Sequence, residues 1–74
     1  MGHRADERIE TLDLSVRSYN CLLRAGWDTV NKVIGAVETN NIRNCRNLGR
    51  KSYREILERL NGKGYGPFRD RWTE

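Results

Sequence analysis

The chain has 74 residues, with 14 lysines or arginines against 10 aspartates or glutamates, for a net charge of +4. A chain of this length forms one domain and buries too little surface to enclose a deep catalytic cleft, which favours a surface that binds a partner. The sequence shows neither the apolar h-region of a signal peptide nor an apolar run of about 18 residues, so we expect a soluble, cytoplasmic protein without a membrane-spanning segment.

The basic residues are concentrated in one part of the sequence. Residues 43–63 carry seven basic and two acidic side chains, a net charge of +5, whereas residues 1–42 carry −1 and residues 64–74 are neutral overall. A segregated basic segment indicates an acidic partner, most often nucleic acid, although a merely solvated basic surface gives the same pattern.

Residues 1–10 are predicted to form a disordered lead-in, because they are polar and offer only Ile9 as an apolar anchor. Their first three residues, Met-Gly-His, are typical of a start codon followed by a cloning remnant. A lone His3 and two distant cysteines, Cys21 and Cys45, do not have the spacing of a metal site, so neither a metal nor another cofactor is expected. Free thiols are favoured over a disulfide.

Residues 11–74 are predicted to form a single all-α domain of four to five helices, with no repeat and no strand pattern. The first helix begins after Ser15, a good N-cap, and ends at Gly26, a good residue to follow a helix. At 100° per residue, the side chains predicted to face the core are Val16, Tyr19, Leu22 and Leu23. Those predicted to face outward are Arg17, Asn20, Cys21 and Arg24.

A second helix is predicted directly after the first, capped by Asp28 or Thr29, with Trp27 packed at the junction. Its apolar positions have helical spacing and are Val30, Val33, Ile34 and Val37. A third, weak helix is predicted from Thr39 to about Asn44, because the paired asparagines within it disfavour helix formation.

The last helix has the clearest pattern. Its apolar stripe consists of Tyr53, Ile56, Leu57 and Leu60, and the pair Asn61-Gly62 is predicted to close it. Residues 62–74 are predicted to form an irregular, glycine-rich tail, from which Tyr65, Phe68 and Trp72 can fold back onto the core.

Two segments carry groups that attract phosphate. In "NLGRKS", Gly49 is predicted to form a tight turn before a helix N-terminus, where Lys51 and Ser52 add a charge and a hydroxyl donor. Alone, this motif also describes an ordinary helix start. Arg17 lies at another helix N-terminus, where its charge is unfavourable, which indicates a role in the minor groove or on a phosphate rather than in helix stability. A solvated arginine whose stem lies along the helix gives the same pattern.

Catalysis is not predicted. Cys21 is the one candidate nucleophile beside a cation, but no base accompanies it, since the single histidine lies in the lead-in. The carboxylates Asp13, Glu55 and Glu58 do not have the paired spacing of an acid and a base. A small residue that permits close approach to a partner is the better interpretation of Cys21.

The stretch "LDLSVRSYNCL" (Leu12–Leu22), the following "RAG" and the later "RNLGRKS" together resemble the C-terminal domain of the bacterial RNA polymerase α subunit. The resemblance implies a compact, monomeric domain with helix-hairpin-helix character, associated with the nucleoid. It also implies binding to the minor groove of A/T-rich upstream promoter DNA, with contacts to σ factor and activators. The family's DNA-contacting positions fall on Arg17, Asn20, Cys21, Gly49, Lys51, Ser52 and Glu55.

The resemblance further implies that Arg17 enters the minor groove, that Asn20 fixes the backbone register, and that Cys21 allows close approach. Its σ-facing acidic patch falls on Asp13, whereas a second acidic position is occupied by Thr11. The middle of the sequence departs from the family and holds one extra residue before Arg46. This departure leaves open a freestanding or fused relative that acts as a regulatory or protein-interaction module. A helix-hairpin-helix module of a repair enzyme accounts only for "NLGRKS".

Overall fold

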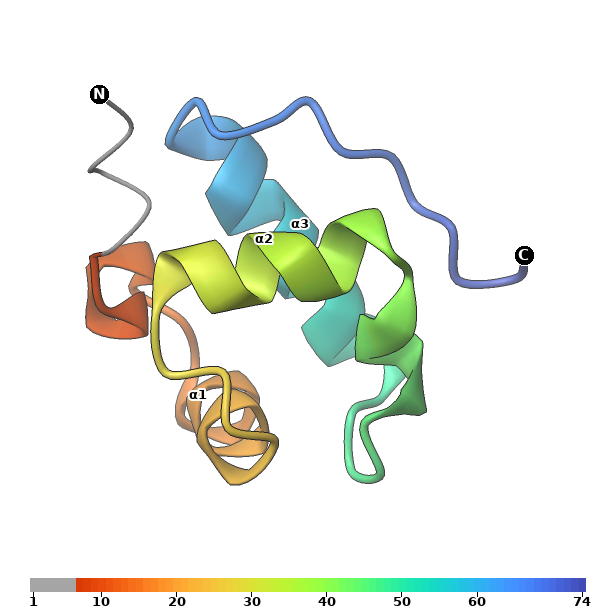
Figure 1. The fold of residues 1–74 in the computed structure, drawn as a ribbon, viewed down its shortest axis with the longest axis horizontal. Coiled ribbons are helices and arrows are strands. Elements are labelled where there is room, and N and C mark those ends of the chain that lie inside the picture. Colours follow the sequence, from red (N-terminus) through yellow and green to blue (C-terminus); the bar gives the residue numbers. More distant parts are fainter. Residues whose placement is uncertain (1–6) are drawn as a thin grey trace.

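The computed structural model describes residues 7–74, and these residues fold into a set of helices that pack around one core (Figure 1). The predicted all-α class is confirmed, and the described residues contain no strand, only an isolated β-bridge between Arg8 and Thr29. The predicted weak helix is a short 3₁₀ turn. The elements are 3₁₀ helix η2 (Ile9–Leu12), α1 (Val16–Arg24), α2 (Val30–Glu38), 3₁₀ helix η3 (Asn41–Asn44) and α3 (Arg50–Gly62).

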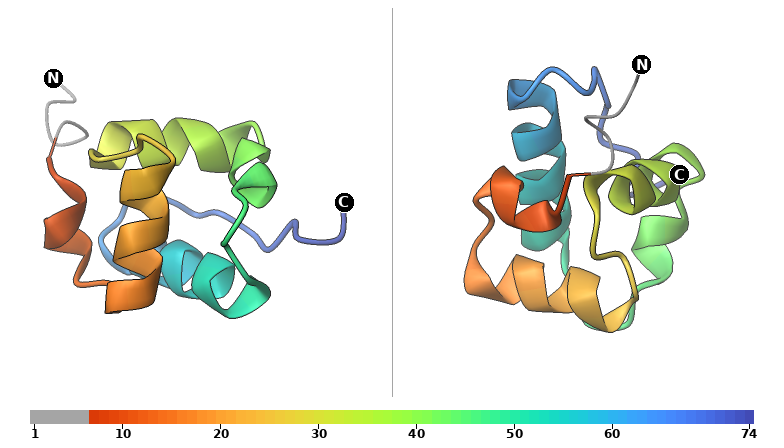
Figure 2. Two further views of the ribbon diagram at one scale, coloured as in Figure 1. Left: turned by 90° about the horizontal axis from the view of Figure 1, so that it is seen from below. Right: turned by 60° about the vertical axis from the view of Figure 1, so that its left-hand side comes forward.

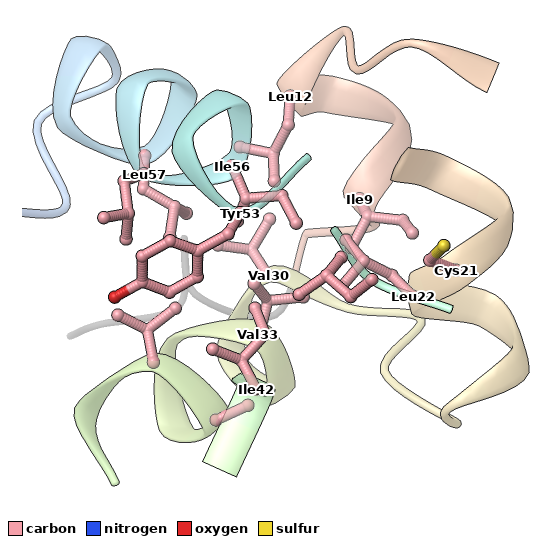
Figure 3. Close-up of a cluster of buried hydrophobic side chains, with 14 residues drawn as sticks. Ile9, Leu12, Cys21, Leu22, Val30, Val33, Ile42, Tyr53, Ile56 and Leu57 are labelled. Atoms are coloured by element: carbon pink, nitrogen blue, oxygen red, sulfur yellow. The ribbon is translucent and has the colours of Figure 1, made fainter. Parts of the chain in front are cut away.

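Residues 7–10 belong to the fold, in contrast to the predicted disordered lead-in. Ile9 is completely buried (Figure 3). Its backbone N–H donates to the carbonyl of Asp28 at 3.3 Å, and the N–H of Val30 donates to the carbonyl of Glu7 at 2.7 Å. This segment therefore pairs with the link between α1 and α2, which its polar composition did not reveal. The predicted cloning remnant lies in residues 1–6, outside the described residues.

The predicted helix caps are largely confirmed. The Ser15 hydroxyl accepts a hydrogen bond from the N–H of Ser18, and the Thr29 hydroxyl accepts one from the N–H of Lys32, which identifies Thr29 rather than Asp28 as the cap of α2. Gly26 follows α1 in the left-handed region, with φ of 87°. The end of α3 differs from the prediction, because the helix continues through Gly62.

The buried face of α1 is rotated from the predicted one. Val16, predicted to lie in the core, is 75% exposed, whereas Ser18 is fully buried and Cys21 is 5% exposed. Of the predicted core residues of α1, Leu22 is fully buried, and Tyr19 is partly buried and packs against the core. The buried face of α1 includes the small residues Ser18 and Cys21, which a pattern of large apolar side chains does not detect.

The core lies between α1, α2 and α3, with η2 and η3 closing its ends (Figure 3). All three helices contribute to it, and the predicted stripe of α3 is buried as expected. The buried apolar side chains are Ile9, Leu12, Cys21, Leu22, Val30, Val33, Ala36, Val37, Ile42, Leu48, Tyr53, Ile56, Leu57 and Leu60.

The tail folds back onto the core, as its aromatic residues predicted. It runs from the end of α3 toward the end of α2 and η3 (Figure 1). The ring of Trp72 packs against that of Tyr53 with centroids 5.2 Å apart, and the Tyr53 hydroxyl accepts a hydrogen bond from the N–H of Arg71 at 2.8 Å. Arg71 in turn donates to the carbonyl of Glu38 at 3.1 Å, which ties the tail to α2.

Replacing Trp72 by alanine is expected to destabilise the domain by about 1–2 kcal/mol, because a half-buried aromatic side chain and its ring pair are lost. Urea unfolding followed by far-UV circular dichroism measures the change. Arg69→Ala is the control, since that exposed side chain makes only a surface ion pair, with Glu74 at 3.2 Å. Equal stability of the Trp72 variant and the natural sequence would show that the tail does not contribute to the fold.

Candidate nucleic-acid interface

A basic hollow lies where α1 faces the N-terminus of α3. The two helices contact each other and cross, and the link of residues 45–49 leads into α3 beside α1 (Figure 2, left). The hollow has a volume of about 680 Å³. It brings together six of the seven predicted DNA-contacting residues and leaves only Glu55 outside. The residues that line it are Arg17, Asn20, Cys21, Arg24, Asn47, Gly49, Arg50, Lys51 and Ser52.

The cations around this hollow are mostly uncompensated. Arg17, Arg24 and Lys51 are exposed, and none of the ion pairs formed within residues 7–74 involves them. Arg50 differs, because its guanidinium lies 3.9 Å from the Asp70 carboxylate. No carboxylate lines the hollow. A partner with a high density of negative charge would therefore be attracted to it.

The N-terminus of α3 opens into the hollow without a side-chain cap. Gly49 occupies the N-cap position, and no side chain there accepts a hydrogen bond from the first turn. Its φ of −88° is ordinary for any residue, so the predicted tight turn does not require glycine. A Cβ atom at Gly49 would contact nothing within 4 Å, which shows that the space beside the backbone is open. The first N–H groups of α3 are thus available to an anion.

Glu55 does not line the hollow, in contrast to the role that the resemblance implied. Its carboxylate accepts hydrogen bonds from the Ser15 N–H at 2.7 Å, the Ser15 hydroxyl at 2.9 Å and the Ser18 hydroxyl at 2.6 Å. Partial burial acts to raise the pKa of Glu55, but the hydrogen bonds from Ser18 and Ser15 outweigh it, so the pKa lies below its usual value. Glu55 therefore holds the start of α1 against α3.

Cys21 is buried beneath the rim of the hollow, so its predicted outward orientation is wrong. Its thiol donates to the carbonyl of Asn47 at 3.2 Å, and the thiol of Cys45 contacts the carbonyl of Cys21 at 3.7 Å. Both cysteines are free thiols. They tie the side of α1 to the link before α3, which places Arg17 and Lys51 around one hollow. Sequence reasoning missed Asn47, although it lies within the quoted "RNLGRKS" stretch.

Asp13 lies outside the hollow. It is exposed at the C-terminal end of η2 and adopts the left-handed region, with φ of 56°, just before α1.

Across residues 7–74, no three histidine, cysteine, aspartate or glutamate side chains gather in a way that could hold a metal ion. No helix among these same residues is long and apolar enough to cross a membrane.

A small helical domain with uncompensated cations around an uncapped helix N-terminus belongs to the anion-binding class of modules. The comparisons with known proteins specify the family. Residues 2–62 match the family of C-terminal domains of the bacterial RNA polymerase alpha subunit, and the protein belongs to this family. The resemblance noted in the sequence is thereby confirmed.

One relative is the DNA-directed RNA polymerase subunit alpha of Carboxydothermus hydrogenoformans, which is 52% identical over 60 residues. The match covers 81% of the present sequence and 19% of that protein, so the sequence spans about a fifth of the length of this curated relative. No solved structure matches the present sequence.

Proposed function

We propose that this protein is a non-catalytic DNA-binding domain of an RNA polymerase α subunit and contacts the minor groove of A/T-rich upstream promoter DNA. The observation that carries the proposal is the hollow in which Arg17, Lys51 and the uncapped start of α3 converge without a compensating carboxylate. A/T-rich tracts have a narrow minor groove with enhanced negative potential, which attracts an inserted guanidinium.

The residues predicted to contact DNA have distinct parts in this proposal. Arg17 enters the groove, and Asn20, exposed one turn further along α1, contacts the sugar-phosphate backbone and fixes the register. Lys51 and the first N–H groups of α3 hold a phosphate, and Ser52, which is 6% exposed, lines the hollow from a buried position. Cys21, buried below the rim of the hollow, holds α1 to the link before α3, and Glu55 anchors the start of α1. A single module of this kind binds weakly, with Kd of roughly 10⁻⁴–10⁻⁶ M.

We extend the proposal to protein partners on a separate surface. Asp13 is exposed and lies outside the hollow, so a σ factor held through this carboxylate would not compete with DNA. Transcription activators are further partners that family membership supports, within the nucleoid of a bacterial cell. A freestanding regulatory relative would share the DNA surface but would need no σ contact.

Titration with an A/T-rich duplex, followed by amide chemical shifts in ¹H–¹⁵N spectra, tests the proposal. Residues 17–21 and 49–52 are expected to shift, and a G/C-rich duplex of equal length is expected to bind more weakly because its minor groove is wider. Arg17→Ala is expected to abolish this preference, whereas Asp13→Ala should leave DNA binding intact. If residues 17–21 and 49–52 do not shift, DNA binding through this surface is refuted. A protein-interaction module is then the better interpretation, and changes near Asp13 rather than Arg17→Ala should abolish partner binding.

A further inference from the structure

A second hollow adjoins the first at the C-terminal end of α1. It has a volume of about 350 Å³ and lies between the end of α1, η3 and the link of residues 45–49. Its lining combines two arginines and three asparagines with four apolar residues. The lining residues are Cys21, Arg24, Ala25, Trp27, Asn41, Asn44, Cys45, Arg46 and Asn47.

The two hollows form one continuous surface. Cys21, Arg24 and Asn47 line both of them, so Arg24 lies at the boundary. Arg24 follows Arg17 by seven positions along α1, a rise of about 10 Å at 1.5 Å per residue. This distance corresponds to about three base pairs along the axis of B-form DNA. The second hollow thus extends the basic surface along the axis of α1.

The charge of the second hollow also favours a polyanion. Arg24 and Arg46 are exposed, and neither takes part in an ion pair within residues 7–74. No carboxylate lines this hollow. The amides around it supply further donors, and the Asn44 side chain is held by a hydrogen bond to that of Asn41 at 2.9 Å. Guanidinium and amide groups of this kind are the usual partners of DNA phosphates.

We propose that the DNA-binding surface continues into this second hollow, where Arg24 and Arg46 bind backbone phosphates of the same duplex beyond the segment held by Arg17 and Lys51. This inference rests on the proposed function and adds a longer footprint to it. Continuity with the first hollow, through Arg24, favours a duplex over an acidic protein as the occupant. These contacts contribute affinity and orientation rather than base preference, because phosphates carry no sequence information.

The salt dependence of binding tests the two arginines. The slope of log K against log salt is negative, and each phosphate contact that is lost reduces its magnitude by roughly 0.9, so the double substitution R24A/R46A should reduce it by about 1.8. Arg54→Ala is the matched control, since Arg54 is exposed, has no ion pair within residues 7–74 and lines a separate hollow with Glu58 and Asp70. The control should leave the slope nearly unchanged. Retained amide spectra would show that the variants fold.

The two tryptophans provide an independent measurement on the natural sequence. Trp27 lines the second hollow, whereas Trp72 packs against Tyr53 and lines neither hollow. The indole N–H signal of Trp27 should shift on addition of an A/T-rich duplex, and that of Trp72 should stay in place. A short poly-glutamate peptide at the same ionic strength should not reproduce the Trp27 shift.

The outcomes separate this inference from the proposed function. If residues 17–21 and 49–52 shift with DNA but Trp27 does not, and R24A/R46A keeps the natural slope, the second hollow is not part of the footprint while the proposed function stands. If poly-glutamate moves Trp27 and DNA does not, the occupant is an acidic protein and the inference is overturned. If no residue of either hollow responds to DNA, both proposals fail together.

Discussion

Replacing Ile9 by alanine is expected to destabilise the domain by about 2–5 kcal/mol, whereas replacing Val16 by alanine should change its stability by less than about 0.5 kcal/mol. Ile9 is fully buried, so its truncation removes apolar contacts and leaves a cavity. Val16 is 75% exposed, and its truncation removes only side-chain surface that already contacts water. A domain of this size has a stability of a few kcal/mol, so the Ile9 variant is expected to be largely unfolded at 25 °C.

Urea unfolding at constant pH measures both variants against the natural sequence. The pair is informative because hydrophobic patterning alone ranks the two residues in the opposite order, with Val16 in the core and Ile9 in a lead-in. Leu12→Ala is a second core variant, since Leu12 is 1% exposed on the same 3₁₀ helix. A stable Ile9 variant together with an unfolded Val16 variant would contradict the observed packing of η2 and α1.

The contrast between these two residues shows what periodicity can and cannot predict. The stripe of α3 was predicted correctly because it consists of large apolar side chains, among them Ile56 and Leu60, that only burial explains. The core face of α1 instead includes Ser18 and Cys21, which carry little hydrophobic signal. Their burial depends on partners that lie elsewhere in the sequence, so no window of local pattern identifies it.

The candidate site also contains both residues that the sequence predicted and residues whose roles it did not predict. Two sequence blocks placed Arg17, Asn20 and Lys51 on one surface, and the structure brings them around one hollow. The roles of Glu55 and Cys21 were not predictable from their spacing, because their partners are Ser15 and Asn47, 40 and 26 residues away. The position of the Glu55 carboxylate near phosphate-binding groups is explained by its hydrogen bonds to Ser15 and Ser18, which the sequence alone does not reveal.

Glu55→Ala is expected to destabilise the domain by about 1–3 kcal/mol and to weaken DNA binding without changing its salt dependence. The substitution leaves the buried Ser18 hydroxyl and the Ser15 N–H without their acceptor, and partial exposure of the carboxylate limits the loss. Because Glu55 anchors the start of α1, the position of Arg17 becomes less well defined. An unchanged salt slope would distinguish this positioning role from direct contact with DNA. A slope altered as much as in Arg17→Ala would instead place Glu55 in the contact surface.

The pH dependence of stability isolates the charge of Glu55. Its pKa in the folded domain lies below the ordinary value of 4.5, so folding favours the ionised form. The stabilisation is fully present above about pH 4.5 and is lost as the pH falls through the folded pKa. Glu55→Gln cannot ionise, so the difference in unfolding free energy between it and the natural sequence should shrink on acidification.

Two other carboxyls with lowered pKa values, Glu10 beside Tyr19 and Asp28 beside Lys32, are present in both proteins and cancel in this difference. Urea unfolding of the pair, repeated in steps from roughly pH 7 to 3, gives the curve directly. A difference that stays constant over that range would show that the neutral side chain holds α1 as well as the carboxylate does. A difference that vanishes in acid would establish the ionised Glu55 as the group that fixes α1, and with it Arg17, against the start of α3.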